Sequence, residues 1–127
     1  VYKRQGQRRS FTHIDDASMA FSVLLEHPEA GNRAFNVGNP ANDTSIRELV
    51  SLMMEIYEEL TGERPANELV EIAGEEFYGA GYEDTNRVVP DISAIRSLGW
   101  EPQHDLETTF RETMRSYLGA TVGSAIG

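Results

Sequence analysis

The residues best suited to contact a ligand lie in a glycine-rich stretch, FYGAGYED, and shortly after it. Tyr78 and Tyr82 could stack on a base or a sugar ring, because an aromatic side chain loses little conformational freedom when it is ordered. Gly79 and Gly81 would let the backbone approach a ligand closely, and Arg87 could add a phosphate contact. Tyrosines that only pack on the edge of the domain would give the same pattern, so both interpretations stay open.

Two adjacent arginines, Arg8 and Arg9, offer a second ligand contact. An arginine at the mouth of a strand can hold a phosphate through two parallel hydrogen bonds, a geometry that lysine lacks. Two solvated arginines on the surface would give the same sequence. Composition by itself favours that second interpretation.

Two groups of acidic residues admit a catalytic or metal-binding interpretation. His13, Asp15 and Asp16 could bind a divalent ion or act in acid–base chemistry. Two aspartates directly before an apolar helical stripe are better explained as helix caps, and we predict no metal site. A later group could supply the paired carboxylates of a glycoside hydrolase, but an acidic loop in an acidic protein is more simply a solvated surface. That group is Glu75, Glu76, Glu83 and Asp84.

Several motifs of known chemistry are absent from the sequence. There is no G-x-G-x-x-G and no P-loop, so no cradle for a dinucleotide or a triphosphate is predicted. No tyrosine is followed four positions later by lysine, and no serine lies in a recognisable nucleophile context. We therefore expect no cofactor-binding residue in this chain.

Apolar spacing predicts the elements that position these residues. Ser10 to Ile14 favours extended structure, and Asp15 and Asp16 then begin a helix that ends at His27. The inward stripe of this helix is Ala17, Ala20, Phe21 and Leu24. Ala34 to Val37 is predicted as a short strand.

A second helix carries the best local signature. Ser45 and Glu48 have the S-x-x-E spacing of a capping box, and apolar residues continue at helical spacing to Leu60. Gly62 ends the helix. A brief strand is then predicted around 69–72.

The last part of the chain predicts two more helices. Pro90 and Asp91 start a short one that ends at Gly99, and Asp105 caps the final one. The fold class is therefore α/β, with about four helices and two or three short strands. From Gly119 onward the small residues carry no packing signal, so we expect residues 119–127 to form a frayed tail.

Composition excludes several classes of protein. The net charge of −10 would repel a nucleic-acid backbone, and no apolar run is long enough to span a membrane. The chain has no cysteine, which is typical of a cytoplasmic protein. We predict a cytoplasmic protein that binds neither nucleic acid nor membranes.

The first five residues, VYKRQ, match the translation of a transposon-end sequencing adaptor. We therefore expect residues 1–5 to be an artefact and the functional segment to run from 6 to 118, ahead of the frayed tail. Without Lys3 and Arg4 the net charge would be −10 less two positive charges, or −12. The chain also lacks an initiator methionine, and we expect it to be the tail of a longer protein.

Motifs in a fixed order carry a family resemblance: RSFTHIDDA, FNVGNP, SIRELV and PDISAIRSLGWEP. Together they resemble the C-terminal part of the extended short-chain dehydrogenases/reductases, the NAD-dependent nucleotide-sugar epimerases, dehydratases and decarboxylases. The match runs from about Gly6 to Leu118. The FYGAGYED loop is most similar to the UDP-glucuronate decarboxylases of the aminoarabinose-pathway type.

The resemblance implies an architecture and a set of roles. NAD would bind to an N-terminal Rossmann domain that is absent here, together with a catalytic Tyr-x-x-x-Lys pair. In this chain Gln7 and Arg9 would hold the substrate, Arg9 at its pyrophosphate, and Tyr82 would contact it from the loop. Such enzymes usually form homodimers. The implied role reverses the interpretation of Arg9 that composition favours.

Arg87 departs from the decarboxylase pattern by one position. The resemblance places a catalytic arginine two residues before the proline of the P-[DS]-I segment, which is Val88 here, whereas Arg87 lies three residues before Pro90. Either the loop shifts so that Arg87 binds substrate and serves in catalysis, or the proton donor is absent. The second case favours an epimerase or a dehydratase.

We therefore expect the nucleotide-sugar-binding segment of an NAD-dependent UDP-glucuronate decarboxylase-like enzyme, inactive when alone. One alternative is a 4-epimerase or 4,6-dehydratase of the same fold. The other is a stand-alone acidic module that binds a partner protein.

Overall fold

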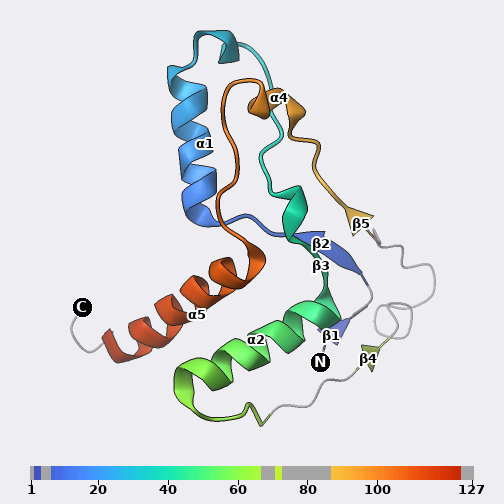
Figure 1. The fold of residues 1–127 in the computed structure, drawn as a ribbon, viewed down its shortest axis with the longest axis vertical. Helices are drawn as coiled ribbons and strands as arrows, with labels where there is room; N and C mark the ends of the chain where they lie inside the picture. The colour runs from blue at the N-terminus through green and yellow to red at the C-terminus, as the bar shows by residue number, and fades with distance from the viewer. Residues whose placement is uncertain (1, 4–6, 67–70, 73–86, 124–127) are drawn as a thin grey trace.

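A computed structural model describes residues 2–3, 7–66, 71–72 and 87–123. Figure 1 shows α1 (Ile14–Glu26) and the short α4 (Ser93–Arg96) at one end of the molecule. The helices α2 (Ile46–Thr61) and α5 (Leu106–Gly123) lie at the other end. A three-stranded sheet lies between the two ends, so helices and strands combine in the predicted α/β class. Within the part of the chain that is described, no helix is long and apolar enough to cross a bilayer.

The central strand is β2 (Arg8–Ser10), which pairs with two neighbours. It runs antiparallel to β3 (Asp43–Ser45) and parallel to β5 (Arg87–Val88), in the order β3-β2-β5. A separate parallel pair joins β1 (Tyr2–Lys3) to β4 (Glu71–Ile72). The β4 strand lies within the brief strand predicted around 69–72. The sheet thus brings the start of the chain against residues about 80 positions later, a proximity that local sequence does not reveal.

The predicted strand at Ala34 to Val37 is wrong. In the structure these residues have no regular secondary structure, although Phe35 and Val37 pack against the core. The side-chain amide of Asn36 donates a hydrogen bond to the backbone carbonyl of Asp91 (3.3 Å). Alternation of apolar side chains reports burial, and here the burial is achieved without a neighbouring strand.

Local signals predict both ends of α2 and the start of α5 well. Ser45 and Glu48 form the predicted capping box, each accepting a hydrogen bond from the other's backbone N–H. Gly62 ends α2 in the left-handed region, with φ of 74°, where a side chain would be strained. Oδ1 of Asp105 accepts a hydrogen bond from the backbone N–H of Thr108 (2.7 Å) at the start of α5.

The helix α5 extends further than we expected. It continues to Gly123, so the first five residues of the predicted frayed tail, 119–123, are helical. Adding a residue to an existing helix costs little, and this favours continuation even where no packing signal exists. Two single turns of 3-10 helix, Pro28–Ala30 and Pro40–Asn42, complete the described elements.

The core lies between α1 and α4. Its fully buried members are Ala20, Ile92, Ile95 and Trp100, with Val23, Leu24, Phe35 and Val37 packed around them. The predicted inward position of Phe21 is wrong, because its side chain is 66% exposed. The apolar stripe of α1 is therefore wider than the surface that the described residues cover.

A charged residue joins the two helices at the opposite end, and an aromatic pair joins α5 to the segment that follows β2. Nη2 of Arg111 in α5 donates hydrogen bonds to Glu59 in α2 (3.0 Å) and to Glu107 one turn earlier (2.6 Å). The rings of Phe11 and Phe110 meet edge to face, with centroids 5.1 Å apart. These contacts fix α5 relative to α2 and to the segment that follows β2.

Candidate functional site

Two of the predicted substrate-binding residues contact each other at β2. Nη2 of Arg9 donates a hydrogen bond to Oε1 of Gln7 (3.4 Å), and its Nη1 donates to the backbone carbonyl of Arg8 (2.8 Å). Gln7 is buried and Arg9 is half-buried. The guanidinium of Arg9 is thus oriented by the side chain of Gln7 and by the backbone of Arg8.

The neighbouring Arg8 is occupied by structural contacts. Its Nε donates to Oδ2 of Asp43 (3.0 Å) and its Nη2 to the backbone carbonyl of the same residue (3.2 Å). Its Nη1 lies 3.5 Å from Oε2 of Glu48. The hydrogen bond to Asp43 raises the pKa of Arg8 above its ordinary value. Arg8 therefore ties β2 to β3 and to the first turn of α2, so the two arginines differ in their contacts.

The structure settles the strand register at Arg87. Arg8 and Arg87 are partners in the parallel pair β2–β5, and Arg9 is the partner of Val88. Partners in adjacent strands lie on the same face of a sheet. The position at which the decarboxylase resemblance expects an arginine is therefore on the face of Arg9, where this chain has the exposed Val88.

The loop residues of the prediction lie outside the described part of the chain. They are Tyr78, Gly79, Gly81 and Tyr82, together with the acidic group Glu75, Glu76, Glu83 and Asp84. Their roles stay predictions.

The caps predicted at Asp15 and Asp16 are wrong in position. The N-cap of α1 is His13, whose Nδ1 accepts a hydrogen bond from the backbone N–H of Asp15 (3.0 Å). The two aspartates lie within the first turn, where a negative charge still favours the helix dipole. A histidine can take the cap position because its unprotonated ring nitrogen is a hydrogen-bond acceptor.

Asp16 instead anchors a distant segment. Its carboxylate is buried and accepts two hydrogen bonds from His104, one from the backbone N–H (3.0 Å) and one from ring Nδ1 (2.9 Å). Its backbone carbonyl accepts a hydrogen bond from Nε1 of Trp100 (3.0 Å). A buried carboxylate is costly unless it is well paired, and here both oxygens have partners.

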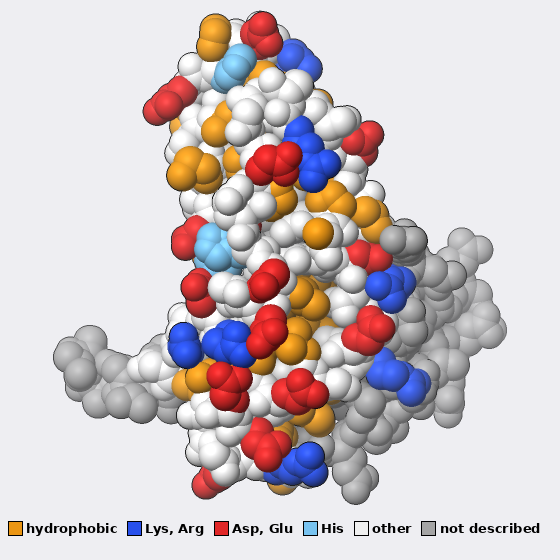
Figure 2. Space-filling model, viewed as in Figure 1, with side chains coloured by type: hydrophobic (Ala, Val, Ile, Leu, Met, Phe, Trp, Pro, Cys, Tyr) orange, Lys and Arg blue, Asp and Glu red, His pale blue; other side chains and the backbone are white. Residues whose placement is uncertain are grey.

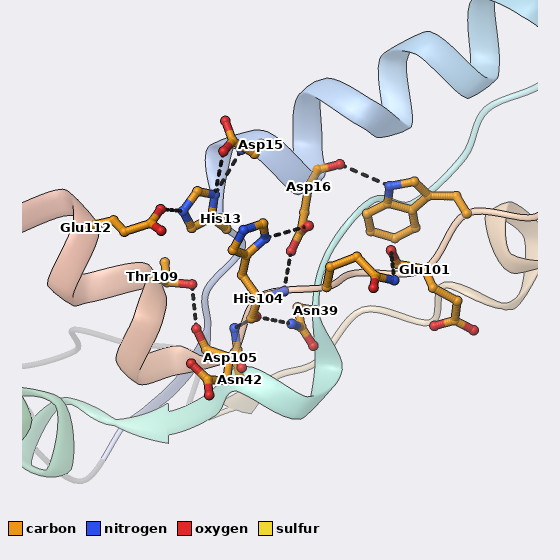
Figure 3. A network of polar contacts seen from close by, with 12 residues as sticks. His13, Asp15, Asp16, Asn39, Asn42, Glu101, His104, Asp105, Thr109 and Glu112 are labelled. Atoms are coloured by element: carbon orange, nitrogen blue, oxygen red, sulfur yellow. Dashed lines mark hydrogen bonds and ion pairs between the residues drawn. The ribbon is translucent and has the colours of Figure 1, made fainter.

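Figure 3 shows that His104 lies at the centre of this network, between α1 and α5. Its backbone carbonyl accepts hydrogen bonds from the side-chain amides of Asn39 and Asn42, both at 3.0 Å. Its ring stacks on that of His13, with centroids 3.9 Å apart and planes inclined by 16°. Nε2 of His13 in turn bonds Glu112 in α5.

Asp16 and His104 within the network, and Asp105 next to it, have pKa values that depart from the ordinary ones. Burial alone would raise the pKa of Asp16, but the hydrogen bonds from His104 outweigh it, so the pKa of Asp16 lies below its ordinary value. The hydrogen bond to Asp16 raises the pKa of His104, and the charges of Glu112 and Asp15 act in the same direction. The hydrogen bonds from Thr108 lower the pKa of Asp105.

A cleft of about 460 Å³ opens beside the network, between the start of α1 and the middle of α5. Hydroxyl, carboxylate and imidazole groups line it: Thr12, His13, Asp15, Thr109, Glu112 and Thr113. Figure 2 shows carboxylate side chains bordering the histidine patch near the middle of the molecule. The hydroxyls of Thr109 and Thr113 already donate to backbone carbonyls within α5 (2.6 and 2.7 Å).

Sequence reasoning missed His104 and Glu112 altogether. His104 meets Asp16 across 88 positions, and Glu112 meets His13 across 99. The spacing of a lone histidine in a proline-containing segment carries no signal of such contacts. Of these residues only His13 carries a signal in the sequence, and its neighbours Asp15 and Asp16 indicate a local cluster and no long-range contact.

Comparison with known proteins adds the family relationship. No protein-family model matches the chain. It is 37% identical over 122 residues to UDP-D-apiose/UDP-D-xylose synthase of Oryza sativa subsp. japonica. It is 38% identical over 120 residues to UDP-D-apiose/UDP-D-xylose synthase 1 of Arabidopsis thaliana. These alignments cover 94% and 89% of this chain but 30% and 31% of the synthases, so the chain spans just under a third of their length.

Solved structures show the same relationship in three dimensions. The PbgP3 protein from Burkholderia pseudomallei superposes with a TM-score of 0.74 at 30% identity, over 95% of this chain and 34% of that one. RMD from Pseudomonas aeruginosa, solved in complex with NADPH, gives a TM-score of 0.64 at 23% identity, over 87% and 32%. The second likeness shows the fold alone.

These matches confirm the resemblance that the sequence motifs predicted. The chain is related to the C-terminal part of the extended short-chain dehydrogenases/reductases that act on nucleotide-sugars. More narrowly, the proteins to which it is similar include the UDP-D-apiose/UDP-D-xylose synthases.

Proposed function

We propose that this chain is the nucleotide-sugar-binding segment of an NAD-dependent UDP-glucuronate decarboxylase-like enzyme. The observation that carries the proposal is the identity of 37% to a UDP-D-apiose/UDP-D-xylose synthase along 94% of the chain. The oriented guanidinium of Arg9 beside the buried Gln7 supports it, because a pyrophosphate needs a fixed cationic donor. The enzyme that contains this segment is proposed to be a cytoplasmic homodimer.

The nicotinamide cofactor would supply reversible oxidation at carbon 4 of the sugar, and a ketone beta to the carboxylate makes the loss of carbon dioxide feasible. This chain has no glycine-rich dinucleotide motif and no Tyr-x-x-x-Lys pair, so the cofactor would be held elsewhere in the enzyme. The residues of this chain would bind and orient the substrate. Arg9 would hold the pyrophosphate, with Gln7 in the same substrate-binding segment, and Tyr82 and Arg87 would contact the substrate. The isolated chain would show no turnover.

A 4-epimerase or a 4,6-dehydratase of the same fold is the second candidate. It is favoured by Val88, which replaces an arginine of the decarboxylase pattern on the face of Arg9. Without a charged donor at that position, the chemistry would end at oxidation and return of the hydride, or at loss of water.

The experiment that separates the two is an assay of the full-length enzyme on UDP-glucuronate with NAD. Release of carbon dioxide together with a UDP-pentose or its 4-keto form supports the decarboxylase. An epimerised uronate without carbon dioxide would overturn it and support the second candidate. The isolated chain, tested in the same assay, should form no product.

A further inference from the structure

Two imidazole rings stack where α1, α5 and the segment before α5 meet. His13 ends the segment that follows β2, and His104 lies in the segment between Trp100 and α5. Their centroids are 3.9 Å apart and their planes are inclined by 16°. We refer to His13 and His104 as the histidine pair. Nothing in the proposed binding of a nucleotide-sugar uses it.

The hydrogen bonds of each ring assign its protons. Nδ1 of His13 accepts from the backbone N–H of Asp15, so in this geometry the ring is neutral and carries its proton on Nε2, which donates to Glu112. Nδ1 of His104 donates to the carboxylate of Asp16. The Nε2 of His104 is therefore the position at which the pair can take up a further proton.

The geometry disfavours a shared metal ion. Ligand atoms of His13, Asp15, His104 and Glu112 all lie within 4.8 Å of one another, which is close enough to suggest one. A nitrogen lone pair, however, lies in the plane of its ring, and two nearly parallel planes 3.9 Å apart do not converge on one ion. Nε2 of His13 also carries the proton that a ligand atom must lose.

The charges that face the histidine pair are mostly negative. Asp15 and Asp16 face it from α1, Glu112 from α5, and Asp105 from the segment of His104 itself. Arg111 acts on Asp105 from the next turn of α5. Such surroundings stabilise one positive charge on the pair. A second charge would remove the cap of α1, because a protonated Nδ1 of His13 no longer accepts a hydrogen bond.

We propose that the histidine pair takes up one proton, on His104, and that this proton controls the stability of the surrounding structure. The charge on His104 strengthens the junction of α1, α5 and the 101–105 segment, and its loss in alkaline solution loosens that junction. The sign follows from the network. Asp16 raises the pKa of His104 above its ordinary value of 6.5, so the folded state binds this proton more tightly than the unfolded chain does. The stabilisation is fully present below pH 6.5 and is lost as the pH rises through the folded-state pKa.

The protonation states can be read directly by nitrogen-15 NMR of the histidine rings of the 127-residue chain between pH 5 and pH 9. We expect His104 to gain and lose its charge within this range, and we expect the neutral ring of His13 to carry its proton on Nε2. His27 provides a control within the same spectrum, because its Nδ1 also caps a helical turn, at Glu29 (3.2 Å), without a stacked ring among the described residues. A proton on Nδ1 of His13, or a His104 that is neutral at pH 6, would overturn the proposal.

Stability measurements test the consequence. For the unmodified chain we expect the urea midpoint to fall between pH 6 and pH 8.5. In His104→Asn the amide nitrogen can replace Nδ1 as donor to Asp16 but cannot become charged, so this fall should be absent. His27→Asn retains an N-cap acceptor and should keep the fall. An equal fall in His104→Asn would contradict the proposal. If that variant does not fold, Asp16→Asn serves instead: the NMR titration of His104 should then move to lower pH, and an unchanged titration would contradict the proposal equally.

Discussion

Arg9 in β2 and Val88 in β5 are register partners in parallel strands, so they lie on one face of the sheet. Val88 is the position at which the decarboxylase pattern has an arginine, whereas Arg87 is the partner of Arg8. Arg8 is engaged with Asp43 and Glu48. The one-residue offset in the sequence therefore places Arg87 and the expected arginine position, Val88, on opposite faces of a short sheet. In the proposed enzyme, the choice between decarboxylation and the alternative reactions would depend on this difference.

Replacing Arg9 should weaken the binding of UDP-sugars by the full-length enzyme. Loss of a charge-assisted hydrogen bond costs about 1.5–3 kcal/mol, so Arg9→Ala should raise the Kd for UDP-glucuronate by roughly 10- to 100-fold. Titration calorimetry would measure it. Arg64→Ala is the matched control, because that side chain is 85% exposed and pairs only with Glu58 among the described residues. Equal affinities for both variants would contradict the role of Arg9.

Restoring an arginine at Val88 should have the opposite effect. Val88 is 53% exposed, so Val88→Arg should alter the free energy of unfolding by no more than about 0.5 kcal/mol. The new guanidinium would share a face with Arg9 and should tighten UDP-glucuronate binding by about tenfold, or about 1.4 kcal/mol.

Val89→Arg controls for the added charge, because Val89 is also exposed but follows the end of β5. The same calorimetric titration compares the two variants. A gain of the same size in both would show that net charge, and not the face of Arg9, determines binding.

The capping box is the feature that sequence predicted most completely, and it can be tested alone. Ser45→Ala removes the hydroxyl that accepts from the backbone N–H of Glu48 (3.1 Å) and should lower the free energy of unfolding by about 0.5–2 kcal/mol. Chemical denaturation measures the loss. Ser51→Ala is the control, since its hydroxyl only donates to the carbonyl of Arg47 one turn earlier in the same helix. A loss of equal size there would contradict the role of the cap.

The success at Ser45 and the failure at Asp16 have one physical cause. A capping box involves residues three positions apart, so its pattern is complete in the local sequence. The partner of Asp16 is 88 positions away, and an aspartate beside a helix start looks like a cap wherever its true partner lies. The same limit applies to Ala34 to Val37. Apolar alternation correctly indicates that Phe35 and Val37 pack inward, but it cannot show whether a neighbouring strand is available to pair with them.

In the candidate site, too, local contacts could be predicted from the sequence and long-range contacts could not. Gln7 and Arg9 are two positions apart and could be grouped by sequence, and the structure shows their contact. The pairing of Arg9 with Val88 could not be predicted, because strand register depends on the whole path of the chain between them. The relation to nucleotide-sugar enzymes could be predicted from the family motifs. Composition alone favours two solvated arginines on the surface and gives no indication of that relation.

Asp16 should govern the stability of the chain in acid. The hydrogen bonds from His104 hold the pKa of Asp16 below its ordinary value of 3.8, so its contribution is present above pH 3.8 and is lost as the pH falls through the folded-state pKa. In Asp16→Asn the amide can accept only one of the two hydrogen bonds from His104. The variant should lose about 1–3 kcal/mol at pH 7 and show a shallower decline between pH 4 and pH 2. Urea denaturation at a series of pH values measures both effects, with Glu63→Gln, in the exposed turn after α2, as the charge-matched control. An acid decline as steep in Asp16→Asn as in Glu63→Gln would show that other carboxyl groups carry the acid sensitivity.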